Sequence, residues 1–296
     1  MPSAGTGGEG RRLLFVGTAA SLGCLLGPTQ LSGYETLTAH AYNDAQLAER
    51  TEALAASRPQ LTVIVDPTRY AAQTLAKLPG WRLGLLTAPA ATAERVGGAQ
   101  ACHLLVSLDP RLDRLGPLHV WRAIAPPVSP RFYAPRRRRE GLALTVGRYS
   151  AYRESVLLEA KHRFDLLQIL EGAQAEELAD WFTRYPVAVY VPSDPAAGAG
   201  WQVAAHLAAG QLLLSEPQPT MFGLEEGIDY LPFRGAKELI HLLDTVARFP
   251  EAFQAIAVRG RLKAQQFRAE SVWQRLLADV LAWRQIAADP LSGAAL

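Results

Sequence analysis

AGAGWQVAAHLAAGQLLLSE, residues 197–216, is the stretch of the chain that decides its fold. The small residues after Trp201 predict a short helix, Gly210 ends that helix, and the apolar run after Gly210 predicts a buried strand. A glycine-punctuated loop that opens a helix beside a strand is typical of α/β folds. The N-terminus of such a helix can face a bound phosphate or sugar, so the stretch predicts a ligand site as well.

Apolar runs that predict strands alternate with helical patterns on both sides of this stretch. The expected strands are 13–17, 61–66, 81–87, 103–109, 119–125, 142–148, 165–170, 187–193 and 211–216. The expected helices are 44–57, 70–78, 153–164, 175–185, 201–209, 236–248, 251–259 and 262–288, and a loop is expected at 18–43. Because continuous apolar strands that alternate with helices are typical of parallel sheets covered on both faces, we expect an α/β protein.

The proline-rich segment PPVSPRFYAPRRRRE, residues 126–140, separates two such series. Its prolines exclude a helix or a central strand and predict a linker. Its four consecutive arginines are expected to be solvated, with an anionic partner as the alternative. The predicted organisation is a disordered terminus at 1–10, Rossmann-like doubly wound domains at 11–125 and 141–270 joined by the linker, and a C-terminal helix at 271–296 that packs back on the first domain. A cleft between the two domains is the expected ligand site.

Composition and charge exclude several other classes of protein. The chain has 296 residues, enough for two domains, and a net charge of only +2, which argues against a nucleic-acid partner. After the apolar run at the N-terminus, no run reaches the ~18 apolar residues of a membrane span. Cys24 and Cys102 fit no disulfide or zinc pattern and the histidines show no metal-ligand spacing, so we expect no metal and a reducing, cytoplasmic setting. Arg11 and Arg12 before an apolar run also outline a signal peptide, but a first buried strand fits better.

Four segments together resemble a known family: PPVSPRFYAP at 126–135, VGRYSAYRE at 146–154, the helix and strand at 201–216, and LEEGIDYLPFRGAKELIHLL at 224–243. The chain is similar to the GT-B glycosyltransferases, and within them to the CgeB-like branch of the glycosyl-transferases-group-1 superfamily. The resemblance implies a nucleotide-diphosphate sugar as donor substrate with no further cofactor. It also implies an acceptor that is a glycan, a protein or a lipid-linked molecule, bound on the side of the first domain. It does not predict the oligomeric state.

Two arginines are the most specific functional signal. In the family that the chain resembles, a strand ending in Val-Gly-Arg is followed about five residues later by a second basic residue, and both hold the donor's diphosphate. These roles carry over to Arg148 and Arg153. A guanidinium suits this task because it is always charged and its planar fork matches phosphate oxygens. The alternative is two surface arginines, but a cation at a helix N-terminus is opposed by the helix dipole and favours a nearby anion.

The family's donor loop carries two glutamates eight positions apart, one near the donor sugar and one that accepts hydrogen bonds from the ribose. Ala197 and Ala205 stand at those positions, so both carboxylates are missing. The resemblance places the donor loop at Ser193, Asp194, Gly198, Gly200, Trp201, Gln202, His206 and Glu216. His206, Asp194 or Glu216 could replace a lost glutamate, although a helical histidine is more often structural. Trp201 is either a stacking platform or part of the core.

The predicted cleft residues of the first domain are Gly17, Thr18, Tyr42, Asn43 and Thr87. The segment at Gly17 and Thr18 comes after the first strand but matches neither a dinucleotide nor a Walker motif. Tyr42 and Asn43 precede a helix, so a capping turn with Asn43 or Asp44 as the cap is expected first and an acceptor contact second. Related proteins carry a polar turn after the corresponding strand, and Thr87 is the residue of that turn that this chain keeps.

Two functions are consistent with these observations. The first is a glycosyltransferase-like enzyme that transfers sugar from a nucleotide-diphosphate sugar; its catalytic residues are not assigned. The alternative, motivated by Ala197 and Ala205, is a catalytically inactive GT-B homologue that serves as a glycan-binding or partner subunit. An NAD-type oxidoreductase is disfavoured because no dinucleotide fingerprint is present after either candidate first strand.

Overall fold

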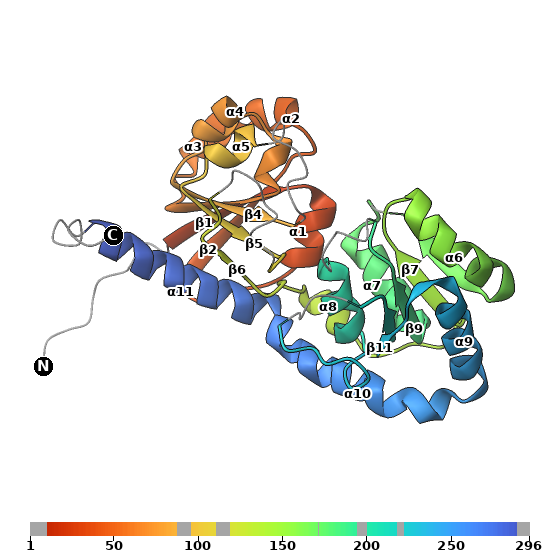
Figure 1. Ribbon diagram of the computed structural model, residues 1–296. Coiled ribbons are helices and arrows are strands. Elements are labelled where there is room, and N and C mark those ends of the chain that lie inside the picture. Colours follow the sequence, from red (N-terminus) through yellow and green to blue (C-terminus); the bar gives the residue numbers. More distant parts are fainter. Residues whose placement is uncertain are drawn as a thin grey trace, which may run out of the picture.

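A computed structural model describes residues 11–87, 96–110, 119–170, 172–193, 200–217 and 222–288, which form two parallel sheets flanked by helices (Figure 1). The first sheet contains β1 (Arg11–Gly17), β2 (Tyr34–His40), β3 (Leu61–Val65), β4 (Trp81–Leu86), β5 (Leu104–Ser107) and β6 (Arg122–Ala123), in the order β2-β1-β3-β4-β5-β6. β3 is buried along its whole length and β1 from its third residue on, because their apolar side chains face helices on both sides.

Two helices far apart in sequence cover one face of the first sheet. They are α1 (Ala19–Leu25) and α11 (Ala269–Ala288), whose Leu22 and Leu276 share a core with Phe15 of β1. The other face is covered by the short helices α2 (Asp44–Ala48), α3 (Thr51–Ala56), α4 (Ala72–Ala76) and α5 (Gly97–Gln100), with a 3₁₀ turn at Pro67–Arg69. The first sheet is therefore sandwiched between two helical layers.

The second sheet contains β7 (Ala143–Val146), β8 (Leu166–Ile169), β9 (Val187–Tyr190), β10 (Leu212–Ser215) and β11 (Leu231–Pro232), in the order β11-β10-β9-β7-β8. One face is covered by α6 (Ala151–Arg163) and α9 (Gly235–Arg248), and the other by α7 (Ala175–Arg184) and α8 (Trp201–Ala208). α10 (Gln254–Lys263) packs against α8 and β10. The predicted fold class, α/β with two doubly wound units and C-terminal helices, is confirmed.

Each sheet has one point at which the strand order reverses. β1 lies between β2 and β3, and β7 lies between β8 and β9, so the chain proceeds outward in opposite directions from β1/β3 and from β7/β9. In doubly wound folds, ligands bind outside the carboxyl ends of the strands at such switch points. The candidate ligand-binding residues are therefore those directly after β1, β3, β7 and β9.

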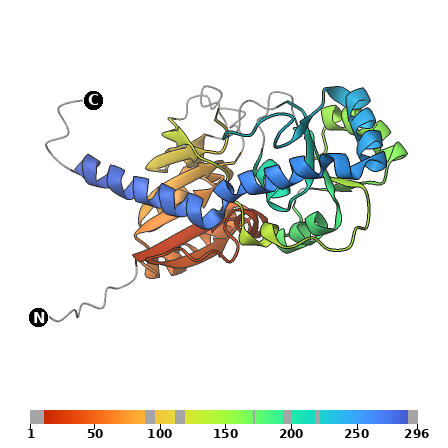
Figure 2. The ribbon, with the colours of Figure 1, turned by 90° about the horizontal axis from the view of Figure 1, so that it is seen from below.

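The last helix joins the two units. α11 lies along the first sheet, as Figure 2 shows. Trp273 of α11 has no exposed surface, its ring meets Phe15 edge-on at a centroid distance of 5.0 Å, and its Nε1 donates to the Leu25 carbonyl oxygen at 2.9 Å. The chain crosses between the units where Val128 N donates to the Phe267 oxygen at 2.7 Å and Ala269 N donates to the Val128 oxygen at 3.0 Å. The two crossing segments thus brace each other.

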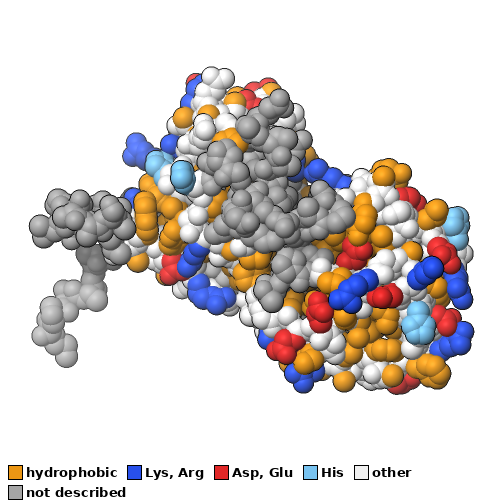
Figure 3. Space-filling model, in the orientation of Figure 1, with side chains coloured by type: hydrophobic (Ala, Val, Ile, Leu, Met, Phe, Trp, Pro, Cys, Tyr) orange, Lys and Arg blue, Asp and Glu red, His pale blue; other side chains and the backbone are white. Residues whose placement is uncertain are grey.

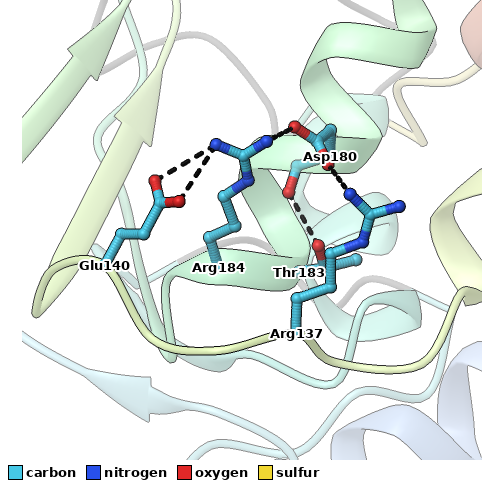
Figure 4. Close-up of polar contacts among 5 residues, drawn as sticks. All are labelled: Arg137, Glu140, Asp180, Thr183 and Arg184. Carbon is cyan, nitrogen blue, oxygen red and sulfur yellow. Dashed lines mark hydrogen bonds and ion pairs between the residues drawn. The ribbon is translucent and has the colours of Figure 1, made fainter.

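The proline-rich segment packs more closely than expected. Val128 and Phe132 are buried in the core of the second unit, and Phe132 lies in a 3₁₀ turn at Pro130–Tyr133. The four arginines after this turn are exposed, as expected, and two of them also contact the second unit: Arg137 Nη1 donates to Asp180 Oδ1 at 2.6 Å (Figure 4), and Arg136 donates to the carbonyl oxygens of Pro186 and Gly210. Asp180 also pairs with Arg184, which pairs with Glu140. The arginine run therefore fastens this segment to the second unit.

Three of the expected segments differ most from the structure. The expectation of a loop over 18–43 is wrong, because α1 and β2 lie within it. The helix expected at 44–57 is two helices, α2 and α3, and the backbone N–H of Arg50 closes a tighter turn onto Leu47 between them. The helix expected at 262–288 is interrupted by a 3₁₀ turn at Ala264–Phe267, because the chain there pairs with Val128 before α11 begins.

Candidate functional site

The switch point of the second sheet is held together by Arg153. This residue lies in the first turn of α6, its Nη1 donates to the Val191 oxygen after β9 at 2.6 Å, and its Nη2 donates to Thr145 Oγ1 of β7 at 3.0 Å. The residue is only 3% exposed. Arg153 therefore braces the carboxyl ends of both strands with two of its nitrogens, and its predicted contact with a diphosphate stays a prediction.

Gly147 makes room for this guanidinium. Its φ is +148°, and a Cβ at this position would lie 2.4 Å from Arg153 Nη1. The next residue, Arg148, is exposed, and Ser150 then caps α6 by accepting a hydrogen bond from Arg153 N at 3.1 Å. Arg148 thus stands at the carboxyl end of β7, beside the positive end of the α6 dipole. The structure places both predicted arginines at this end of the sheet, one exposed and one buried.

The first turn of α8 lies after the neighbouring strand. Gly200 begins the helix without a side-chain cap, and its N–H donates to Tyr190 Oη at the end of β9, at 2.9 Å. The Gln202 side chain folds back over Gly200, where a Cβ would lie 2.1 Å from Gln202 Oε1. Trp201 is half-buried and packs against Phe132 at a centroid distance of 5.8 Å. The predicted donor-loop residues Gly200, Trp201 and Gln202 therefore share one helix start.

His206 lies in the core between α8 and α7. Its ring stacks on Phe182 with the centroids 4.2 Å apart, and its Nδ1 is 2.8 Å from Gln211 Oε1. Burial lowers the pKa of His206 to about 4, and the positive charge of Arg153 acts in the same direction. Its Nε2 is shielded from solvent and has no hydrogen-bond partner among the described residues. His206 is thus held as a neutral, buried ring.

Glu216 supplies a carboxylate to the carboxyl end of the second sheet. It lies directly after β10, is 8% exposed, and its Oε1 accepts a hydrogen bond from Tyr152 Oη at 2.6 Å. Burial raises the pKa of Glu216, against the effect of the Tyr152 hydrogen bond. Burial and the contact with Glu216 raise the pKa of Tyr152 to about 12. The pair joins the start of α6 to the end of β10.

The rest of the predicted donor loop is only partly described. Ser193 is exposed after β9, whereas Asp194, Ala197 and Gly198 lie outside the described residues. Ala205 has no exposed surface and belongs to the core formed by α7 and α8. A side chain at position 205 therefore points into packed apolar surroundings in this structure.

At the first switch point, Gly17 ends β1 and Thr18 caps α1. Thr18 Oγ1 accepts from Ser21 N at 3.1 Å. Asp66 lies directly after β3 in the left-handed region at φ +52°, and its Oδ1 accepts from both N and Oγ1 of Thr87, at 3.0 and 2.6 Å. Thr87 lies directly after β4, so this carboxylate links the carboxyl ends of two strands. Asp66 is a polar group at the switch point that the sequence pattern did not reveal.

The predicted pair Tyr42 and Asn43 lies at the start of α2. Asn43 Oδ1 accepts from Gln46 N at 3.0 Å and is the helix cap. Tyr42 is 54% exposed, and its N–H donates to Gln46 Oε1 at 2.9 Å. Asp44 instead accepts from Ala71 N at 2.8 Å, which ties α2 to α4. The capping interpretation accounts for Asn43, and a contact of either predicted residue with an acceptor stays a prediction.

Tyr152 and Tyr190 were likewise not predicted from the sequence. Tyr152 contacts Glu216, and Tyr190 accepts the hydrogen bond of Gly200. Tyr152 lies inside the VGRYSAYRE motif, so its position next to Arg153 was the available signal. Tyr190 is the last residue of β9, and a polar group at a strand end of a parallel sheet is the corresponding signal.

Charged side chains of both signs are interspersed over the second unit on the face shown in Figure 3. Within the described ranges, no group of three or more His, Cys, Asp and Glu side chains is placed to hold a metal ion. The helices of the described part of the chain include none with the length and apolarity needed to cross a membrane.

Two doubly wound parallel units, with a final helix that returns to the first, define the GT-B architecture. Solved glycosyltransferase structures share it. Anabaena HepE in complex with UDP-glucose matches 92% of this chain and 99% of its own, with a TM-score of 0.59 and 10% identity. Sucrose-phosphate synthase from Thermosynechococcus elongatus matches 94% of this chain and 100% of its own, with a TM-score of 0.58 and 10% identity.

A glycosyltransferase from Rickettsia africae is also similar, with a TM-score of 0.55 and 8% identity over 95% of this chain and 100% of that chain. No family model and no curated protein sequence matches this chain. Identities this low show a shared fold alone. The predicted likeness to GT-B glycosyltransferases is therefore confirmed as a fold, and the CgeB-like branch stays a prediction.

Proposed function

We propose that this protein binds a nucleotide-diphosphate sugar at the carboxyl end of its second sheet and transfers the sugar to an acceptor. The observation that carries the proposal is the position of Arg148, an exposed guanidinium just after β7 at the switch point, two residues before the cap of α6. A cation at a helix N-terminus is opposed by the helix dipole. A bound diphosphate is attracted both by the Arg148 guanidinium and by the N-terminus of α6, so it offsets the repulsion between these two groups.

The neighbouring groups suit the same ligand. Arg153 adds a second, buried positive charge in the first turn of α6, and the N-terminus of α8 adds a helix dipole after the adjacent strand. Positive potential at this point stabilises the charge that develops on a departing diphosphate, which is how such a site would lower the barrier to transfer. The HepE structures hold UDP and UDP-glucose, which supports a uridine nucleotide as the first donor to test.

The test is a thermal-shift and turnover measurement with UDP-, GDP- and ADP-glucose on the wild-type protein and two variants. We expect at least one donor to raise the Tm. Arg148→Ala should weaken that donor's binding at least ~10-fold, because a charge-assisted hydrogen bond contributes about 1.5–3 kcal/mol. Arg163→Ala, which removes an exposed arginine at the other end of α6, is the matched control and should leave binding unchanged. Equal effects of the two substitutions would refute the assignment of Arg148.

A second candidate function is a catalytically inactive GT-B homologue that acts as a glycan-binding or partner subunit. Ala205 favours it: the resemblance places a ribose-binding glutamate at this position, and here a fully buried alanine occupies it. Nucleotide binding without turnover of any donor, in the presence of glycan, protein and lipid-linked acceptors, would support this candidate over the first.

We further propose that the protein belongs to the CgeB-like branch and works in the cytoplasm. The motif VGRYSAYRE at 146–154 and the segment at 224–243 support the branch. Cys24 and Cys102 are both free, and burial raises the pKa of each thiol to about 12. Unpaired thiols are usual in reducing compartments.

A further inference from the structure

The first sheet carries a pocket that the proposed donor site does not use. It has a volume of about 540 Å³ and lies between the loop after α1 and the first turn of α11. Six residues between 29 and 36 and Glu270 line it. Its volume falls in the range of about 300–1,000 Å³ that is usual for small-molecule sites.

The pocket is at the opposite edge of the sheet from the switch point. β2 runs parallel to β1 with Tyr34 beside Arg11 and His40 beside Gly17. Tyr34 therefore marks the amino end of the sheet, whereas Gly17 marks the carboxyl end. The pocket is separate from the ligand-binding edge of the first sheet, and the proposed donor site is on the other sheet.

Its lining consists mainly of unpaired polar groups. The side chains of Gln30, Ser32, Tyr34 and Glu270 make no hydrogen bond or ion pair with another described residue. They offer an amide that both donates and accepts, two hydroxyls, and one carboxylate. Among the described residues, no lysine, arginine or histidine lines the pocket. This set repels anions and matches a neutral ligand that carries many hydroxyl groups.

Apolar surface completes the match. Tyr34 is half-buried against the core that α11 forms with the first sheet, so its ring is fixed while its hydroxyl makes no bond to another described residue. Leu31 also lines the pocket and is only 3% exposed. A ring held in this way presents a flat apolar surface with a polar tip. A sugar ring has the complementary form, with an apolar C–H face and hydroxyl groups around its edge.

The frame around the pocket is fixed on both sides. Thr29 Oγ1 donates to the Leu26 oxygen, and Tyr34 N donates to the Leu31 oxygen at 3.1 Å, which holds the loop. The start of α11 is held by the contact of Ala269 with Val128, so Glu270 keeps its place at the rim. Thr36 Oγ1 beside the pocket is shielded from solvent and has no partner among the described residues.

We propose that this pocket binds a neutral saccharide, separately from nucleotide-sugar binding on the second sheet. Tyr34 supplies the stacking surface, and Gln30, Ser32 and Glu270 bind the hydroxyl groups. The site does not depend on donor turnover, so it would serve either an active transferase or an inactive glycan-binding homologue.

The test is a glycan array of neutral, uronic-acid and sulfated oligosaccharides probed with the full-length protein, followed by calorimetry with the best neutral oligosaccharide. We expect neutral oligosaccharides to be retained, Tyr34→Ala to weaken binding at least ~10-fold, and Glu270→Gln to weaken it about 5-fold. Glu35→Gln is the matched control. Glu35 is an exposed glutamate on β2, next to Tyr34, and its side chain pairs with Arg12 outside the pocket. This substitution should not change binding.

The proposal is overturned if the array retains no neutral oligosaccharide, if anionic oligosaccharides bind better, or if Glu270→Gln leaves the affinity unchanged. Glu270 is exposed, so its substitution tests the site even where Tyr34→Ala lowers the yield of folded protein. Thermal shifts with the nucleotide sugars are measured on the same variants and should remain as in the wild type. The loss of donor binding by Arg148→Ala and the loss of saccharide binding by Glu270→Gln are thus separate results.

Discussion

His206 should make the stability of the protein depend on pH. Gln211 Nε2 donates to the Tyr185 oxygen at 2.8 Å, so Gln211 Oε1 faces His206 and Nδ1 of the imidazole carries the proton. A second proton would have to enter at the buried Nε2, in the field of Arg153. Burial and that charge explain why the pKa of His206 is lowered to about 4 in the folded protein.

The direction of this pH dependence follows from comparison with the unfolded chain, in which a histidine has a pKa of about 6.5. Because the folded pKa is the lower one, the unfolded chain binds the proton more tightly. The stabilising contribution is therefore complete above a pH of about 6.5 and is lost as the pH falls toward about 4. With these two pKa values, linkage gives a loss of about 2 kcal/mol in the free energy of unfolding between about pH 7.5 and pH 5.

The assay is urea-induced unfolding of the wild type and of His206→Asn at four pH values from about 7.5 to about 5. Asparagine keeps a donor toward Gln211 but does not titrate, so this variant should lose about 2 kcal/mol less than the wild type over the same range. His162→Gln, which replaces an exposed histidine on α6, is the control and should behave as the wild type does. The same pH dependence in wild type and His206→Asn would show that His206 does not cause it.

Three further predictions concern packing, backbone and surface charge. Trp273→Ala should lower the free energy of unfolding by about 3–5 kcal/mol in urea, because it empties the contact between α11 and the first sheet, and a loss below about 1 kcal/mol would contradict this docking. Gly147→Ala should lower the Tm and reduce the thermal shift by nucleotide, since its Cβ would displace Arg153, and an unchanged shift would count against that arrangement. Asp180→Asn removes the ion pairs with Arg137 and Arg184 (Figure 4), but every partner has contact with solvent, with side-chain exposures of 67% for Arg137, 31% for Asp180 and 27% for Arg184, so the Tm should fall by less than about 3 °C, and a larger fall would show that the pairs matter more.

The strands that the sequence predicted well are those buried on both faces. β3, β9 and β10 are continuous apolar runs bounded by turn residues, and burial on both faces of a parallel sheet demands such runs. β2 is an edge strand whose sequence YETLTAH contains no continuous apolar run, and the short polar–apolar alternation from Thr36 to His40 was overlooked. Only Ala39 of β2 is buried, so this strand needs no continuous apolar run.

The candidate site was predictable only where a local motif marks it. The motif VGRYSAYRE placed Arg148 and Arg153 at a strand end and a helix start. Arg153 is buried because it binds the Val191 oxygen, 38 residues away in the sequence. Glu216 joins the site because it binds Tyr152, 64 residues away. Such contacts arise from the strand order, and no local pattern encodes them.

The proposed function requires a nucleotide diphosphate to bind at Arg148. Isothermal titration calorimetry with UDP, GDP and ADP on the wild type, Arg148→Ala and the control Arg163→Ala tests it most directly. We expect at least one nucleotide to bind the wild type and the control equally, and to bind Arg148→Ala at least ~10-fold more weakly. Binding of equal strength to all three proteins, or no binding of any nucleotide to the wild type, would contradict it.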